Sequence, residues 1–239
     1  MEYKVNINGL DIEANFSQRS IDEILLPLLQ RLTNMQKEKG SRVLVMVAAP
    51  PGAGKSTLVS FLEKLSKETE GITPIQAIGM DGFHMRQEYL VSHTTVRDGE
   101  EIPMVQIKGA PETFDLTGLM VRVSSVAKAE ICGWPIYDRT LHNPVDNVIT
   151  VDGDIVLLEG NYLLLNRQGW DELSKMADYT IFIKADEKLL RNRLIERKAL
   201  SGNSTSDATS FVDFSDMVNV RTCLQESKPA DLVINVEDL

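Results

Sequence analysis

The chain has 239 residues, enough for one well-buried α/β domain and too few for two full-sized ones. It carries 25 lysines and arginines against 35 aspartates and glutamates, and this net charge of −10 argues against DNA, RNA or an anionic membrane as partner. A small-molecule partner is therefore favoured. The two cysteines lack CxxC spacing, and the sequence has no secretory or membrane-length apolar segment. We expect reduced thiols in a cytoplasmic protein, with the oligomeric state open and a homodimer among the arrangements allowed.

The N-terminal segment, residues 1–41, predicts a small hairpin and a helix packed on the core. Apolar residues alternate across 5–14 on either side of Asn8-Gly9, a pair typical of tight hairpin turns. Ser20 and Glu23 have the spacing of a capping box at the start of a helix. The apolar stripe that follows has helical spacing, and core packing explains it most simply.

A phosphate-binding loop follows the apolar run 43–47 and precedes a helix. Residues 49–56 read Ala-Pro-Pro-Gly-Ala-Gly-Lys-Ser, and the glycines let backbone N–H groups approach a triphosphate closely. The usual pattern opens with glycine, whereas this loop opens with Ala49, which is tolerable if its φ is negative. ATP or GTP binding is the reading favoured over a simple turn. The expected nucleotide contacts are Pro51, Gly52, Ala53, Gly54, Lys55, Ser56 and Thr57.

From residue 42 onward, apolar strands alternate with helical segments, which predicts one P-loop domain over 42–239. This alternation specifies an α/β fold, with a mostly parallel sheet and helices on both faces. The expected strands cover 43–48, 73–78, 131–136, 155–158, 179–183 and 232–236. One helix is expected to start at residue 55. Four more are expected over 86–92, 116–127, 187–198 and 211–226. The Gly/Ser/Thr-rich stretch 201–210 is expected to be mobile.

Two acidic residues follow apolar strands and should lie at the rim where parallel sheets bind ligands. Asp81 ends one such run and Glu159 ends another. Glu159 is a candidate magnesium ligand, and the alternative is a surface carboxylate after a strand. Asp81 is a candidate proton acceptor for an attacking hydroxyl, and the alternative is a common Asp-Gly turn.

Four short motifs stand in order behind the phosphate-binding loop. They are Asp81-Gly-Phe-His84, Pro135-x-Tyr137-Asp138-Arg139, Glu159-Gly-Asn-Tyr162 and Arg193-Leu-x-x-Arg197. Together they resemble the superfamily of uridine kinases, phosphoribulokinases and bacterial pantothenate kinases. The segment 109–115, Gly-Ala-Pro-Glu-Thr-Phe-Asp, and the N-terminal hairpin point more narrowly to the branch labelled fructose transport system kinase or nucleoside kinase-like.

The resemblance implies roles for several of these residues. It implies that Asp81 is the general base and that Ser56 and Glu159 hold Mg²⁺. It also implies that Tyr137 and His142 belong to the acceptor pocket, because uridine kinases have a histidine five residues after the corresponding tyrosine.

Two further side chains are expected at the acceptor. His84 falls inside a motif and is expected there, whereas His93 is expected at the surface. Arg139 is a candidate contact for an anionic or polyhydroxy acceptor, with an ion pair to Asp138 or Glu159 as the alternative.

A helical lid is expected over about 189–210. Arg193 and Arg197 lie four residues apart, so they share a helix face and could both close over transferring phosphates. Arg191 is expected to pair with Glu187 instead. Acceptor specificity is expected in the loop 91–108, which contains Asp98-Gly-Glu-Glu.

These features predict an ATP- and Mg²⁺-dependent kinase that phosphorylates an alcohol group of a sugar, nucleoside or pantothenate-like molecule. Lys55, Arg193 and Arg197 would stabilise charge on the transferring phosphoryl group, and Asp81 would deprotonate the acceptor. The alternative is a P-loop ATPase or GTPase switch, or an assembly factor, that acts on a protein partner. Against it, the sequence has no guanine-reading Asn-Lys-x-Asp.

Overall fold

Five parallel strands form the central sheet of the chain. The computed structural model describes residues 1–7, 10–97 and 99–239, and the strand order in this sheet is β11-β10-β3-β9-β4. Neighbouring strands pair in parallel throughout, so the predicted fold class is confirmed. The strands are β3 (Val43–Ala48), β4 (Ile75–Gly79), β9 (Ile155–Gly160), β10 (Tyr179–Lys184) and β11 (Leu232–Asn235).

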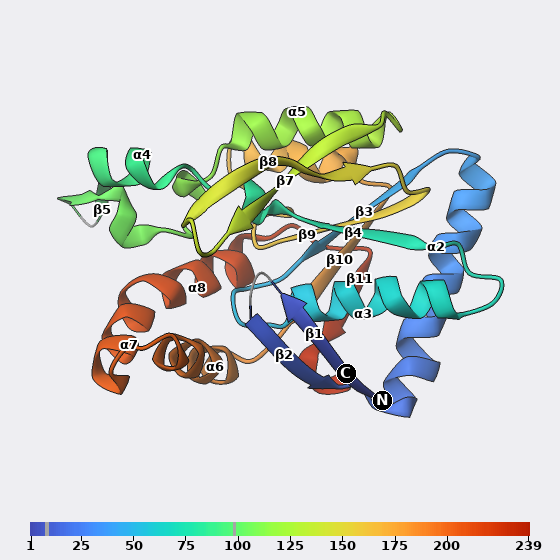
Figure 1. Cartoon of the computed structure of the whole chain (residues 1–239), viewed down its shortest axis with the longest axis horizontal. Coiled ribbons are helices and arrows are strands. Elements are labelled where there is room, and N and C mark those ends of the chain that lie inside the picture. The colour runs from blue at the N-terminus through green and yellow to red at the C-terminus, as the bar shows by residue number, and fades with distance from the viewer. Residues whose placement is uncertain (8–9, 98) are drawn as a thin grey trace.

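The central strand β3 separates two apolar cores. Val43, Val45 and Val47 belong to one buried cluster and the residues between them to the other, because successive strand side chains point to opposite faces. Helix α5 covers one face of the sheet and α2 and α3 cover the other (Figure 1). The helices are α1 (Gln18–Ser20), α2 (Leu26–Lys39), α3 (Lys55–Glu68), α4 (Gln87–Ser92), α5 (Leu116–Ala127), α6 (Glu187–Leu200), α7 (Thr205–Phe211) and α8 (Met217–Glu226).

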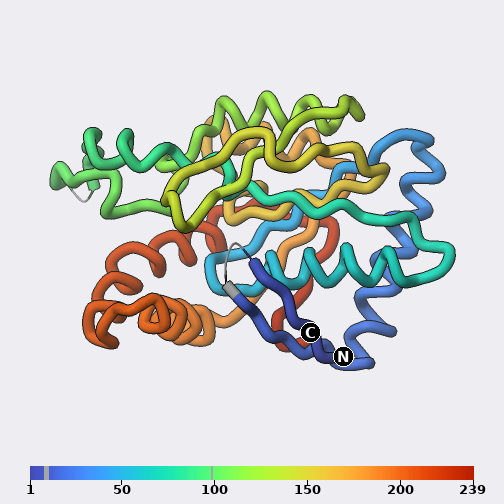
Figure 2. The backbone as a smooth tube through the Cα atoms, in the orientation of Figure 1, coloured from blue at the N-terminus to red at the C-terminus, as the bar shows by residue number. Residues whose placement is uncertain are grey.

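The N-terminal hairpin packs beside α3, as Figure 2 shows. Strands β1 (Glu2–Ile7) and β2 (Leu10–Asn15) pair antiparallel, and the Asn8-Gly9 turn that joins them in our prediction lies outside the described residues. The ring of Phe16 stacks on Phe61 of α3 with 4.1 Å between centroids. The hairpin is therefore anchored to the helix that follows the phosphate-binding loop.

The predicted capping box at Ser20 is wrong. The helix begins at Gln18, because the Ser17 hydroxyl accepts a hydrogen bond from the Ser20 backbone N–H and so caps it. The Ser20 hydroxyl donates instead to the carbonyl of the C-terminal residue. A π-helical turn at Ile21–Leu25 leads into α2.

Two antiparallel hairpins that the sequence pattern does not predict lie outside the parallel sheet. Strand β7 (Cys132–Asp138) pairs with β8 (Asn143–Val151), so the predicted strand over 131–136 belongs to a hairpin and not to the sheet. Strand β5 (Thr94–Arg97) pairs with β6 (Glu100–Pro103) inside the segment expected to be a loop. Asp98, which begins the Asp-Gly-Glu-Glu run, lies outside the described residues.

The second half of the segment 201–210, which we predict to be mobile, is helical. Helix α7 begins at Thr205, capped by the Ser204 hydroxyl, and continues through a π-helical turn into α8. The predicted pairing of Arg191 with Glu187 is also wrong. Arg191 Nε lies 2.7 Å from Asp213 Oδ1 in that π-helical turn. Its ion-pair partner is therefore in the turn between α7 and α8 and not in α6.

Both cysteines are free thiols, with Cys223 buried and Cys132 partly so. Within the described parts of the chain, none of the helices combines the length and the apolar character that crossing a bilayer requires.

Candidate functional site

The phosphate-binding loop joins β3 to α3 at the carboxyl edge of the sheet. Gly52 and Gly54 have φ of +83° and +85°, a left-handed conformation that glycine adopts without strain. A Cβ on Gly52 would lie 3.2 Å from Cγ of Leu194, so α6 packs directly on the loop. Ala49 is not among the described residues with positive φ, which explains why alanine is tolerated at the first position.

Lys55, Ser56 and Glu159 meet at the start of α3. The Ser56 hydroxyl donates to Glu159 Oε1 at 2.8 Å, and Lys55 Nζ lies 3.9 Å from Glu159 Oε2. The geometry follows from the sheet, because β9 pairs with β3 and its last carboxylate emerges beside the loop. Burial raises the pKa of Glu159, and the charge of Lys55 opposes that rise.

A serine hydroxyl beside a carboxylate supplies the oxygen ligands that Mg²⁺ prefers. Among residues 1–7, 10–97 and 99–239, no group of three or more His, Cys, Asp or Glu side chains could hold a metal ion. Ser56 and Glu159 therefore fit an ion that is shared with nucleotide phosphates, as is usual for Mg²⁺.

Asp81 lies directly after β4 in the 3₁₀ turn Met80–Phe83, at the same rim. Its charge adds to the rise in the pKa of Glu159, so Asp81 lies close enough to act on that carboxylate. A Cβ on Gly82 would lie 2.2 Å from the Pro135 carbonyl oxygen, and only glycine lets this turn rest against β7. The sequence prediction that Asp81 and Glu159 share one rim is thus confirmed by their positions.

His84 is held beside Asp81 by aromatic packing. Its Nδ1 lies 2.8 Å from the Asp81 carbonyl oxygen, and its ring centroid lies 4.1 Å from that of Phe114 and 5.1 Å from that of Tyr137. Burial lowers the pKa of His84 below its usual value. A neutral ring that donates Nδ1–H to the carbonyl leaves Nε2 as an acceptor.

Lys108 lies beside Tyr137, and no sequence motif predicts it there. Its Nζ donates to Gln87 Oε1 and to the Tyr137 hydroxyl, each at 2.7 Å, and to the His142 carbonyl at 3.3 Å. Desolvation lowers the pKa of Lys108. It ends the segment 91–108 in which we expected specificity, but a single lysine carries no motif that would identify it.

Arg139 and His142, the two predicted site residues at the tip of the β7–β8 hairpin, are exposed. The Asp138 carboxylate accepts hydrogen bonds from the backbone of Thr140 and Leu141, and in the described chain no carboxylate lies within ion-pair distance of Arg139. The predicted alternative, an ion pair of Arg139 with Asp138 or Glu159, is therefore not formed. His142 has a left-handed φ of +52°, and only its backbone carbonyl contacts Lys108.

The two predicted lid arginines lie on α6. Arg193 Nη1 donates to the Gly52 carbonyl at 3.4 Å, so it reaches the phosphate-binding loop. Arg197 is exposed as a residue, yet protein surrounds its guanidinium closely enough that desolvation lowers its pKa, with Asp216 opposing. The charge of Asp81 also acts on Arg197, so this arginine lies near the Asp81 carboxylate.

A cleft of about 310 Å³ reaches these groups from outside. Ser56, Asp81, Glu159 and Tyr137 are among the residues that line it. Other lining residues come from α3 and from the end of β1, and they include Asn6, Ile7, Ser60 and Glu63. The N-terminal hairpin thus borders the candidate site.

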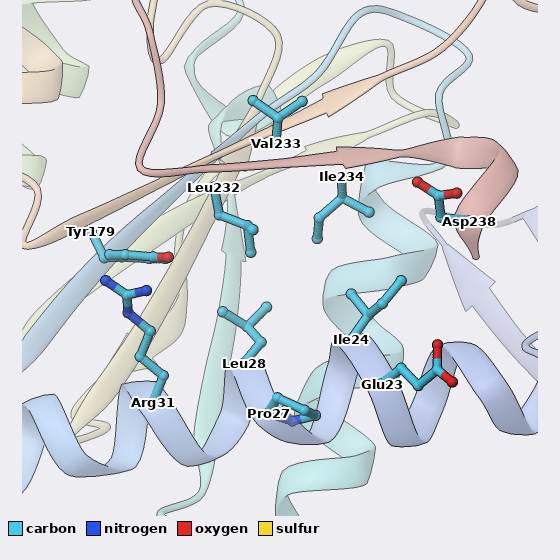
Figure 3. Close-up of a pocket in the computed structure, with 10 residues that line it drawn as sticks. All are labelled: Glu23, Ile24, Pro27, Leu28, Arg31, Tyr179, Leu232, Val233, Ile234 and Asp238. Atoms are coloured by element: carbon cyan, nitrogen blue, oxygen red, sulfur yellow. The ribbon is translucent and has the colours of Figure 1, made fainter.

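A second groove, also about 310 Å³, lies at the opposite edge of the sheet between α2 and β11 (Figure 3). Ile24 and Leu28 face Leu232 and Ile234 across it, and the Arg31 guanidinium lies 4.6 Å from the Tyr179 ring centroid. None of the predicted site residues lines this groove, so it is separate from the candidate site.

Comparisons with known proteins agree with the sequence motifs. The model of the phosphoribulokinase / uridine kinase family matches residues 44–238. The uncharacterized protein YggC of Escherichia coli is 36% identical over 239 residues, which is 100% of this chain and 97% of that protein. A candidate uridine kinase of Schizosaccharomyces pombe is 29% identical over 222 residues, 90% of each chain.

The solved structure of a candidate fructose transport system kinase from Silicibacter is similar in fold. Its TM-score is 0.77 at 28% identity, and the match covers 87% of this chain and 98% of that one. The expected resemblance and the P-loop α/β fold are thereby confirmed.

Proposed function

Because this chain belongs to the phosphoribulokinase / uridine kinase family, we propose that it transfers the γ-phosphate of ATP to an alcohol group of a small molecule. The observation that carries the proposal is the position of Asp81. A P-loop with Lys55, Ser56 and Glu159 suits any ATP-hydrolysing protein, but Asp81 adds a carboxylate at the same rim, and it lines a cleft of about 310 Å³ that would admit the acceptor.

The protein groups divide into those that hold the donor and those that hold the acceptor. The loop 51–57 and the N-terminus of α3 would bind the phosphates, with Lys55, Arg193 and Arg197 neutralising their charge. Ser56 and Glu159 would hold Mg²⁺, which when bound neutralises phosphate charge during transfer.

Asp81 would orient the acceptor hydroxyl and accept its proton as that oxygen bonds to the γ-phosphorus. The bond from phosphorus to the β–γ bridging oxygen breaks, and ADP leaves with that electron pair. His84 and Tyr137 would line the acceptor side, together with Arg139 and His142. Positioning and charge stabilisation then account for most of the catalysis.

An ATP-consumption screen over sugars, nucleosides and vitamin-like alcohols tests this function. We expect ADP to form in step with the phosphorylation of at least one alcohol. ADP formation that no acceptor stimulates, with no phosphorylated product, would favour the switch ATPase instead.

Asp81→Asn distinguishes the two functions more sharply. The substitution keeps the shape of the side chain but removes the proton acceptor, and loss of a general base costs about 10²- to 10⁴-fold in rate. ATP affinity measured by calorimetry should stay near that of the wild type while acceptor phosphorylation collapses. Wild-type phosphorylation by this variant would mean that Asp81 is only a turn residue.

A further inference from the structure

Resting on the proposed kinase function, we propose that Lys108 makes the acceptor site select molecules that carry an anionic group in addition to the hydroxyl that is phosphorylated. The anion is a carboxylate or a phosphate. The hydroxyl would face Asp81 and the anionic group would face Lys108 and Arg139.

The hydrogen bonds of Lys108 are satisfied and its ammonium lies 4.9 Å from the centroid of the Tyr137 ring, but no carboxylate neutralises its charge. All three of its partners, Gln87 Oε1, the Tyr137 hydroxyl and the His142 carbonyl, are neutral oxygens. Within residues 1–7, 10–97 and 99–239, no carboxylate lies within 4.0 Å of its Nζ. A half-buried ammonium that lacks a counter-charge projects positive potential into the adjoining space.

Arg139 shares this condition with Lys108. Across the described chain, no carboxylate lies within ion-pair distance of Arg139. The charges of Lys108 and Arg139 both act on the ring of His84, so their fields overlap beside Asp81. Since the chain has a net charge of −10, carboxylates to pair with these cations are abundant, and a cluster left without them calls for an anionic partner.

Short contacts connect Lys108 to the proposed base. The Tyr137 hydroxyl that accepts from Lys108 belongs to a ring 5.1 Å from that of His84, and His84 Nδ1 lies 2.8 Å from the Asp81 carbonyl. The lysine of the phosphate-binding loop itself is Lys55, which lies 3.9 Å from Glu159, whereas the hydrogen bonds of Lys108 are to Gln87, Tyr137 and His142. Lys108 also occupies a lone pair of the Tyr137 oxygen, which leaves the hydroxyl hydrogen to donate to the acceptor.

A purely structural role is the competing explanation. Lys108 links α4, through Gln87, to the turn of the β7–β8 hairpin, through His142. A structural link would stabilise the fold without affecting which acceptor binds. The two explanations differ in their effect on acid-versus-alcohol preference.

The test uses the full chain saturated with Mg²⁺ and a non-hydrolysable ATP analogue. Calorimetry measures the binding of matched pairs that differ in the anionic group: D-gluconate and D-glucitol, D-glycerate and glycerol, pantothenate and panthenol, and glycerol 3-phosphate and glycerol. At least one acid should bind about tenfold or more tightly than its alcohol, with the preference weakening at high ionic strength. The phosphate pair separates phosphate from carboxylate recognition. If no acid binds more tightly than its alcohol, the proposal is overturned.

Variants then assign the preference to the residue. Lys108→Met should lower the acid preference about tenfold, while Lys108→Arg, which keeps the charge, should retain most of it. Lys228→Met is the matched control, because Lys228 is also partly buried and donates to neutral oxygens, but of the segment 170–176. If Lys108→Met fails to fold, the acid preference is measured in Arg139→Gln instead. Arg139 is exposed, so its substitution should not disturb folding, and its loss should also weaken acid binding. A folded Lys108→Met variant that keeps the full preference would leave Lys108 with a structural role only.

The outcomes also separate this inference from the proposed function. Acids that bind preferentially but are never phosphorylated would contradict the kinase function and support the anion site. Phosphorylation confined to the neutral members of the pairs would support the kinase function and contradict the anion site.

Discussion

At the scale of single residues, the candidate site gathers ionisable groups whose charges are costly to bury. Glu159 has only 13% of its side chain exposed, and burial together with the charge of Asp81 raises its pKa. Lys55 and the Ser56 hydroxyl offset part of that cost. A divalent cation held by Ser56 and Glu159 would favour the charged carboxylate further, so the arrangement is better suited to binding ligands than to stabilising the fold.

His84 makes stability depend on pH in a predictable direction. In the unfolded chain its pKa is about 6.5, and burial lowers it in the folded chain. Below pH 6.5 the unfolded state therefore binds more protons, and stability falls as the pH drops toward the folded pKa, by at most about 1.4 kcal/mol per pH unit for one proton. Urea unfolding between about pH 5.5 and 7.5 should show this slope, and His84→Gln should flatten it.

His93→Gln is the control for that experiment. It also removes one histidine, but His93 is exposed, and its ring stacks on Tyr89 and lies within hydrogen-bond distance of the Tyr89 carbonyl and the Ser92 hydroxyl. A slope that His84→Gln leaves unchanged, or that His93→Gln removes as completely, would contradict the assignment.

At the scale of elements, burial decides what the sequence reveals. Strand β3 is buried along its whole length, so it appears in the sequence as a continuous apolar run and could be predicted to the residue. Strands β7 and β8 are half exposed and interrupted by Pro135 and by Asn147, which has a left-handed φ of +55°. Neither shows clean alternation, and the hairpin they form could not be predicted from local pattern.

The site was predictable to a similar extent. The P-loop, Asp81 and Glu159 follow strands of the parallel sheet in sequence, so their shared rim could be inferred. Lys108 reaches Gln87, Tyr137 and His142 from distant parts of the chain, and only the tertiary structure brings these groups together. Motif order therefore predicts the nucleotide side of the site better than the acceptor side.

The packing of α6 on the phosphate-binding loop can be tested at Gly52. A Cβ there would meet Cγ of Leu194 at 3.2 Å and would also be strained by the positive φ. Gly52→Ala should therefore weaken ATP binding, measured by calorimetry, by displacing both loop and helix, and should destabilise the chain by more than the roughly 1 kcal/mol of backbone strain alone.

Gly71→Ala is the control that measures the cost of backbone strain without a contact. Gly71 has a similar φ of +80°, but a Cβ there would meet nothing within 4 Å. It should cost about 1 kcal/mol and leave ATP affinity unchanged. Equal effects of the two substitutions on ATP affinity would show that the contact with Leu194 is unimportant.

At the scale of the whole molecule, the first 41 residues raise the question of how many units fold together. The match to the family model begins at residue 44, yet Tyr3 and Phe16 belong to the same buried cluster as β3 and α3. The Tyr3 hydroxyl also lies 2.7 Å from Ser60 Oγ on α3. This packing implies that residues 1–41 fold cooperatively with residues 42–239.

Phe16→Ala tests that implication. Phe16 is 6% exposed and stacks on Phe61, so its truncation leaves a cavity between the hairpin and α3. Removing a buried phenylalanine costs about 3–5 kcal/mol. If the chain folds as one unit, calorimetry should still show a single unfolding transition. Its midpoint temperature should fall, because the free energy of unfolding of the whole chain is reduced. Val96→Ala, at a side chain that is 72% exposed, should shift it little. An early transition for the N-terminal segment, followed by a main transition at the wild-type temperature, would contradict this. It would show that residues 1–41 form a separate unit and that residues 42–239 are stable without it.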